Sequence, residues 1–120
     1  LNVVAIGGRL TRDVETRALP SGTTVAKFGL ASNYYAGKDK GEEVSYFDVK
    51  LFGRLAEALS PYLLKGTEVY VSGELRQERW EGKDGNRSRV LIDAKTVRLA
   101  GGKAERGASK ARDFDDDIPF

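Results

Sequence analysis

Apolar and polar side chains alternate with a period of two along most of the first hundred residues, and a helical stripe occurs only once. Such alternation is typical of strands that bury one side and expose the other. Clusters of glycine, serine, proline, asparagine and aspartate separate the alternating runs, as turns do. We therefore predict strands over residues 3–6, 14–19, 24–32, 44–52, 67–81 and 87–99.

The helical signal lies between the fourth and fifth of these runs, at residues 54–64. Its apolar side chains recur at i, i+3, i+4, i+7 and i+8, the stripe of an amphipathic helix. They are Leu55, Ala58, Leu59, Tyr62 and Leu63. Pro61 should kink or shorten this helix, because it lacks a backbone donor and crowds the preceding turn. Gly66 is its predicted stop.

The order of elements predicts the fold class. We expect a turn at residues 20–22, a polar loop at 33–43 and a five-residue hairpin connection at 82–86. Five or six strands with one helix between the central and last strands indicate an all-β fold, a five-stranded Greek-key OB-fold barrel with one short α-helix. The 14 glycines in 120 residues fit a barrel, which uses glycine at corners and bulges.

Strand periodicity also predicts which side chains face the core. In the strand at 44–52 the inward set is Phe47, Val49 and Leu51, and in the strand at 67–81 it is Val69, Val71, Gly73 and Leu75. The other sides carry rings and charges, which a core does not require. These are Tyr46, Asp48, Lys50 and Phe52 on the first strand and Tyr70, Arg76 and Trp80 on the second.

A surface that interleaves exposed rings with cations fits sequence-tolerant binding of single-stranded nucleic acid. Rings stack on bases, and cations neutralise phosphates. Any one ring has the alternative of packing under a loop or at a subunit interface, which we favour for Tyr62 and Tyr70. Tyr34 and Tyr35 flank the polar loop, a position from which a barrel can clamp a strand. Asp48 and Glu74 on the same surface count against the interpretation.

Composition argues against an enzyme and against a membrane protein. The chain has no Cys and no His, so thiol chemistry, zinc thiolate sites and the commonest general base and metal ligand are missing. We expect neither a cofactor nor a metal. No apolar run approaches the roughly 18 residues that span a bilayer, and we expect a cytoplasmic, nucleoid-associated protein. Because the sequence has no Met, we expect a processed or trimmed start.

The last twenty residues differ from the rest. Residues 101–112 have no large apolar side chain, with four Lys or Arg and one Glu, and we interpret them as a flexible basic linker. Residues 113–120 carry four Asp and no cation. Such a clustered acidic end is typical of an interaction tail, and here we expect it to be disordered. We assign residues 1–100 to the barrel domain and residues 113–120 to a partner-binding tip.

Several segments together carry a family resemblance. They are VVAIGGRL at 3–10 with Asp13, VAKFGLA at 25–31, VKLFGRLAE at 49–57, YLLKG at 62–66, VYVSGELR at 69–76 leading to Trp80, and DDDIPF at 115–120. In this order they resemble the bacterial and phage single-stranded-DNA-binding proteins over nearly the whole chain. The resemblance implies an OB fold, usually a homotetramer, that coats single-stranded DNA. It also implies recruitment of replication, recombination and repair proteins through the tip, at Asp115, Asp116, Asp117, Ile118, Pro119 and Phe120.

Carried onto this sequence, the family's base-stacking positions fall at Tyr34 or Tyr35, Tyr46, Phe52 and Trp80. We expect phosphate contacts from Arg9, Lys50, Arg54, Arg76, Arg79, Arg87 and Arg89. Phe47 stands where many members have a His that helps to hold subunits together, so a homodimer is the alternative to the tetramer. The linker is also much shorter than usual and lacks the typical richness in Gln, Pro and Gly.

Two other classes of function remain open. An RNA-binding or sequence-specific OB module would need base-edge readers, and only Gln77 and Asn86 lie near the expected surface. An enzyme is the least favoured, because the only carboxylate cluster, Asp115 to Asp117, lies on the tail, where nothing would fix a substrate or a metal.

Overall fold

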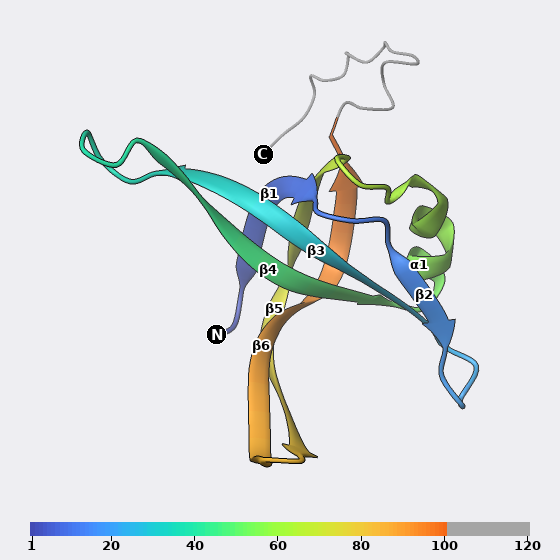
Figure 1. Ribbon diagram of the computed structural model, residues 1–120. Helices are drawn as coiled ribbons and strands as arrows, with labels where there is room; N and C mark the ends of the chain where they lie inside the picture. The colour runs from blue at the N-terminus through green and yellow to red at the C-terminus, as the bar shows by residue number, and fades with distance from the viewer. Residues whose placement is uncertain (101–120) are drawn as a thin grey trace.

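The structure is a computed structural model that describes residues 1–100 of the 120. Six strands and two short helical elements make up this part of the chain (Figure 1). They are β1 (Val4–Leu10), β2 (Glu15–Ala18), β3 (Thr24–Tyr35), β4 (Glu42–Phe52), α1 (Arg54–Leu59), the 3₁₀ helix η1 (Ser60–Tyr62), β5 (Glu68–Gly82) and β6 (Gly85–Leu99).

The strands close into a barrel. Their order is β1-β5-β6-β4-β3-β2, and an additional pairing of β1 with β3 joins the two ends, so that β1, β3, β4, β5 and β6 form the wall and β2 lies on the edge of β3. Only β4 and β6 run parallel among these pairs. Since α1 follows β4 and precedes β5, the prediction of a five-stranded OB-type barrel with one short helix is confirmed.

Two glycines allow the wall to close. At Gly8, where β1 crosses from β5 to β3, a Cβ atom would lie 2.3 Å from the carbonyl oxygen of Ala31. At Gly73 a Cβ atom would lie 2.1 Å from the carbonyl oxygen of Asp93, next to the register shift between β5 and β6. No side chain fits at either point, so the close approach of these strands requires glycine.

One apolar cluster fills the barrel. Its buried members are Leu10, Ala26, Phe28, Leu30, Val49, Leu51, Ala56, Leu63, Val69, Val71, Ile92, Ala94 and Val97. The predicted inward positions Val49, Leu51, Val69 and Val71 are therefore confirmed. Two others were wrong, because Phe47 is 37% exposed and Leu75 is 45% exposed.

The reason is that two strand pairs extend beyond the barrel. Between Ala31 and Val49, β3 and β4 pair only with each other and form an arm that we call the ribbon, residues 32–48. Between Gly73 and Ile92, β5 and β6 form a second arm, the hairpin, residues 74–91. Figure 1 shows the two arms pointing in different directions from the barrel. Phe47 lies on the ribbon and Leu75 on the hairpin, where no opposite wall covers them.

Both arms are longer than predicted. The loop of the ribbon covers residues 36–41 instead of 33–43, because Tyr34 pairs with Glu43 and Tyr35 with Glu42. The hairpin connection leaves only Lys83 and Asp84 between the strands, since Gly82 already pairs with Gly85. Gly85 has a φ of 113°, which glycine tolerates and which lets pairing continue to the turn.

The helix is shorter than its apolar stripe predicted. α1 ends at Leu59, and a 3₁₀ turn that contains Pro61 follows it, so the predicted shortening is confirmed. Gly66, with a φ of 87°, lies in the later turn into β5 and does not end the helix. Ala56 and Leu63 are buried, whereas Ala58 is exposed. The short helix therefore turns a different side toward the core than a continuous one would.

The predicted linker 101–112 and acidic tip 113–120 lie outside the described residues. Within residues 1–100, no helix has the length and apolar character needed to cross a bilayer.

Candidate nucleic-acid interface

The register of β3 and β4 decides which rings of the ribbon share a side. Directly paired residues project to the same side of a sheet, and successive residues to opposite sides. Tyr35 pairs with Glu42, Tyr46 with Ala31, and Phe52 with Val25, without a register shift between them. Tyr35, Tyr46 and Phe52 therefore project to one side.

Tyr34 projects to the other side of the ribbon. Its hydroxyl donates a 3.0 Å hydrogen bond to Oε1 of Glu43, its direct cross-strand partner. The sequence left Tyr34 and Tyr35 as alternatives. The register separates them, and it groups Tyr35 with the rings of β4.

Trp80 belongs to the same side as the β4 rings, although it lies on the other arm. Along β5 it alternates in phase with Glu78 and Arg76, and Nζ of Lys50 donates a hydrogen bond to Oε2 of Glu78. Lys50 in turn lies between Tyr46 and Phe52 in the period of β4. We name the side that carries Tyr35, Tyr46, Phe52 and Trp80 the aromatic face.

The four rings are open to solvent in the single chain. Tyr46 and Tyr35 are 71% and 67% exposed, and Trp80 and Phe52 are 47% and 42% exposed. Large rings at such exposure are not core residues of this chain. They present flat apolar surfaces at intervals along a path from the ribbon, across the wall, to the hairpin.

Ion pairs cover the centre of the aromatic face. Glu78 accepts from Lys50 and, at 3.3 Å, from Nε of Arg89, while Nη1 of Arg89 lies 3.8 Å from Oδ2 of Asp48. These four residues join both arms to the wall. The hydrogen bond from Lys50 holds the pKa of Glu78 below its ordinary value, with the charges of Lys50 and Arg89 acting in the same direction against burial.

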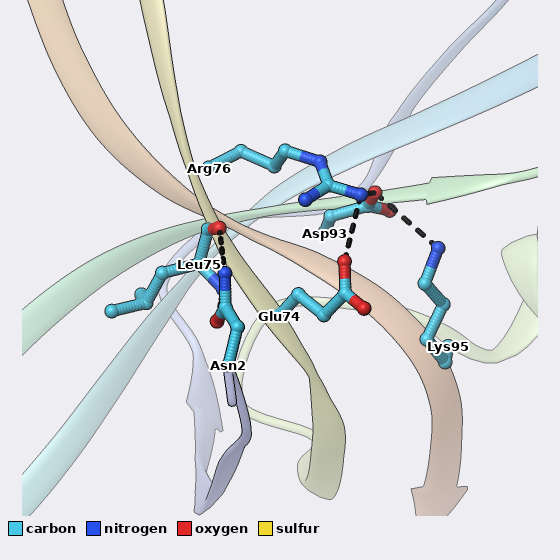
Figure 2. A network of polar contacts seen from close by, with 6 residues as sticks. All are labelled: Asn2, Glu74, Leu75, Arg76, Asp93 and Lys95. Atoms are coloured by element: carbon cyan, nitrogen blue, oxygen red, sulfur yellow. Dashed lines mark hydrogen bonds and ion pairs between the residues drawn. The ribbon is translucent and has the colours of Figure 1, made fainter.

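Figure 2 shows a second group of ion pairs, which adjoins the first through the pairing of β4 with β6. Arg76 lies 2.7 Å from Glu74 and 3.4 Å from Asp93, and Lys95 lies 3.5 Å from Asp93. The two groups meet because Asp93 pairs with Lys50 across β6 and β4. Together they are the central network, with four cations, Lys50, Arg76, Arg89 and Lys95, and four carboxylates, Asp48, Glu74, Glu78 and Asp93, so that its formal charges sum to zero.

Next to this network, the N-terminus is fastened to β5. Nδ2 of Asn2 donates to the carbonyl oxygen of Leu75 at 2.9 Å, and the Leu75 amide donates to Oδ1 of Asn2 at 2.8 Å (Figure 2). The amide side chain thus imitates a further strand pair beyond Val4 and Gly73. It keeps the start of the chain beside the base of the hairpin.

A model of the single-strand binding protein family matches residues 1–100, the whole described part of the chain. The chain belongs to the single-strand binding protein family. The family resemblance drawn from the sequence is thereby confirmed.

Individual relatives agree with this assignment. A single-stranded DNA-binding protein of Treponema pallidum is 44% identical over 115 residues, covering 94% of this chain and 65% of its own length. Those of Helicobacter hepaticus and Aquifex aeolicus are 47% and 40% identical, covering 85% and 99% of this chain and 62% and 82% of their own lengths. The chain thus spans slightly less than two thirds of the length of the first two relatives.

The seven cations predicted to contact phosphate are spread over four places in this family member. Lys50, Arg76, Arg87 and Arg89 lie on the aromatic face, where each is paired with a carboxylate, Arg87 with Asp84 at 3.2 Å. Arg9 lies at the β1–β5 pair near Glu68, and Arg54 opens α1. Arg79 is out of phase with Trp80 and donates to Oε1 of Gln77 at 2.7 Å.

Besides Lys95 of the central network, sequence reasoning missed two cations. Lys27 pairs with Lys50 across β3 and β4, and Arg17 pairs with Val25, which itself pairs with Phe52. Both project to the aromatic face, and within residues 1–100 neither has an ion-pair partner. The alternation in residues 24–32 contains a signal for Lys27, but only the cross-strand register shows which side it shares.

Proposed function

We propose that this chain binds and coats single-stranded DNA without strong sequence preference during replication, recombination and repair. The observation that carries the proposal is the aromatic face, with four exposed rings on the two arms and the wall and with cations between them. Bases can stack on such rings regardless of their identity, because every base has a π face. The cations that lie between the rings can neutralise the phosphates of the strand. We propose no catalytic activity, and we place the protein in the cytoplasm.

The alternative, a sequence-specific or RNA-binding module, would need side chains that form hydrogen bonds with base edges, and the chain has few of them. The whole chain has four amide side chains, Asn2, Asn33, Gln77 and Asn86. Gln77 and Asn86 are out of phase with Trp80 and so lie on the other side of the hairpin, and Asn2 is bonded to Leu75. Asn33 alone shares the side of Tyr35, which is too little for base readout along a strand.

Equilibrium titration separates these functions. We expect tight binding of dT oligomers, weaker binding of rU oligomers and poor binding of duplex, whose bases are already stacked. The affinity for dT should fall with salt at a log-log slope near −0.7 per neutralised phosphate. Equal affinity for duplex and single strand at moderate salt would contradict the proposal, and a strong preference for one base sequence or for rU would favour the alternative.

We further propose a homotetramer, with a homodimer as the alternative. β1 pairs with β3 only at Arg9 and Leu10, so the rest of that strand edge is available to a second copy. Phe47, Leu75 and Val90 are exposed apolar side chains on the arms, Val90 at 58%, and a subunit interface would cover them. Native mass spectrometry with and without a dT oligomer tests this. A monomer at micromolar concentration would contradict it without affecting the fold.

Finally, we propose that Asp115 to Phe120 recruits replication, recombination and repair proteins. The proposal rests on the sequence: the ring of Phe120 can enter a pocket of the partner while basic residues of the partner bind the acidic run. Deleting residues 113–120 should abolish recruitment. Phe120→Ala should also lose recruitment while it retains the negative charge, which separates the ring from the charge. If both variants retain partners as well as the intact chain, the tip has no recruiting role.

A further inference from the structure

The position of Glu78 is unusual for a residue on a surface that is to bind a polyanion. Its carboxylate lies at the centre of the aromatic face, between Trp80 on the hairpin and the rings of β4. One oxygen, Oε2, accepts from Lys50, and the other, Oε1, accepts from Arg89. A single carboxylate therefore occupies two of the cations that a phosphate at this place would contact.

Partial burial strengthens the contacts of Glu78 with Lys50 and Arg89. The side chains of Lys50, Glu78 and Arg89 are 19%, 34% and 38% exposed. Each is thus partly covered, and screening by solvent is weaker than for a fully exposed pair. The lowered pKa of Glu78 agrees with a carboxylate held by its two partners.

We propose that Glu78 is an internal competitor of DNA phosphate, which holds Lys50 and Arg89 in the unbound protein and limits both the affinity and the salt dependence of binding. The proposal rests on the function proposed above. A carboxylate and a phosphate accept from the same ammonium and guanidinium donors. DNA that crosses the face from Trp80 to Phe52 must then replace protein ion pairs with phosphate contacts. The net gain in binding free energy is only the difference between the contacts formed and the ion pairs broken.

The exchange has a consequence for counterions. A cation that is free before binding neutralises a phosphate and releases about 0.7 of a counterion from single-stranded DNA. When Lys50 and Arg89 leave Glu78, the carboxylate is uncovered and attracts a cation from solution in their place. The counterion release is then partly cancelled, so the salt slope is shallower than the number of phosphate contacts predicts.

Glu78→Gln in the full chain tests the proposal, because it removes the charge and keeps the shape. We expect the variant to bind a dT oligomer about threefold to tenfold more tightly at low salt, the factor that corresponds to one or two exposed ion pairs. Its salt slope should be steeper by up to about 1.4, the release of about 0.7 of a counterion from each of two phosphates. Its thermal stability should be equal or lower, so that tighter binding cannot follow from a more stable fold.

Glu57→Gln is the matched control. It removes the same charge from α1, where Glu57 accepts a 3.0 Å hydrogen bond from the Thr24 hydroxyl and has no ion-pair partner within residues 1–100. This variant should gain much less affinity and keep the wild-type slope. Asp48→Asn is the second test, because it frees Arg89 only from a 3.8 Å contact. It should change the affinity in the same direction by a smaller factor.

The outcomes separate this proposal from the function on which it rests. Wild-type protein that fails to prefer dT over duplex contradicts the proposed function itself. If the wild type binds dT but Glu78→Gln binds no more tightly than Glu57→Gln, or keeps the same salt slope, the competitor role of Glu78 is wrong. If Glu78→Gln is unfolded at the assay temperature, Asp48→Asn decides, and an unchanged affinity overturns the proposal.

Discussion

The four strands of the two arms, β3 to β6, continue into the wall of the barrel, where β1 joins them, yet they use their side chains differently in the two regions. In the wall, one side of each strand is buried, as Phe28, Val49 and Ile92 show. On the ribbon, Tyr34 and Tyr35 are both exposed although they project to opposite sides. Packing therefore restricts which side chains the wall can hold. On the arms the strands are paired through their backbones, and that pairing does not restrict the side chains in this way. The arms are thus the region where rings can be kept for a ligand.

The largest expected effect contrasts the stability of the two regions. Phe28→Ala should lower the free energy of unfolding by about 3–5 kcal/mol, because it leaves a cavity in the core. Tyr46→Ala, on the ribbon, should change it by no more than about 0.5 kcal/mol. Urea unfolding measures both. A similar loss for the two variants would show that Tyr46 is packed in the assembled protein, and the contrast between wall and arms would fail.

The second prediction reverses the contrast. Trp80→Ala and Phe52→Ala should each weaken dT binding by about 1–3 kcal/mol, the range for one base–ring stack. Because Trp80 is the only Trp, its fluorescence should also be quenched when dT is added. Tyr62→Ala is the control, a half-exposed ring on η1. An unquenched Trp80 whose removal unfolds the protein would make it a core residue.

Sequence alone predicted the wall well, because burial imposes a period of two that Val49, Leu51, Val69 and Val71 display directly. It could not predict where the wall ends. Phe47 and Leu75 continue the same alternation past the last covering strand, and only the pairing of β4 with β6 shows that nothing lies opposite them. The pairing of Lys50 with Glu78 was also beyond reach, since these residues are 28 positions apart and meet only when the barrel closes.

The third prediction tests the register of the ribbon. Tyr35→Ala should weaken dT binding by about 1 kcal/mol, the low end of the stacking range, because the ring lies on the aromatic face but near the tip of the arm. Tyr34→Ala should have a smaller effect, since its ring projects to the other side and its hydroxyl is bonded to Glu43. If Tyr34→Ala is the more damaging change, the DNA follows the opposite side of the ribbon.

The smallest expected effect concerns the ion pairs that join the arms to the wall. The folded-state pKa of Glu78 is lowered by Lys50 and Arg89, so the ionised carboxylate stabilises the folded chain. This contribution is fully present above the unfolded-state pKa, near the ordinary glutamate value of about 4.3, and it is lost as the pH falls through the lower folded-state value. Surface ion pairs contribute at most about 1 kcal/mol. The difference in unfolding free energy between wild type and Glu78→Gln should therefore be small at neutral pH and vanish in acid.

Glu57→Gln, which breaks no ion pair within residues 1–100, should show a smaller difference. A difference for Glu78→Gln that does not depend on pH would mean that the glutamine changes packing, and that charge does not hold the hairpin to the wall.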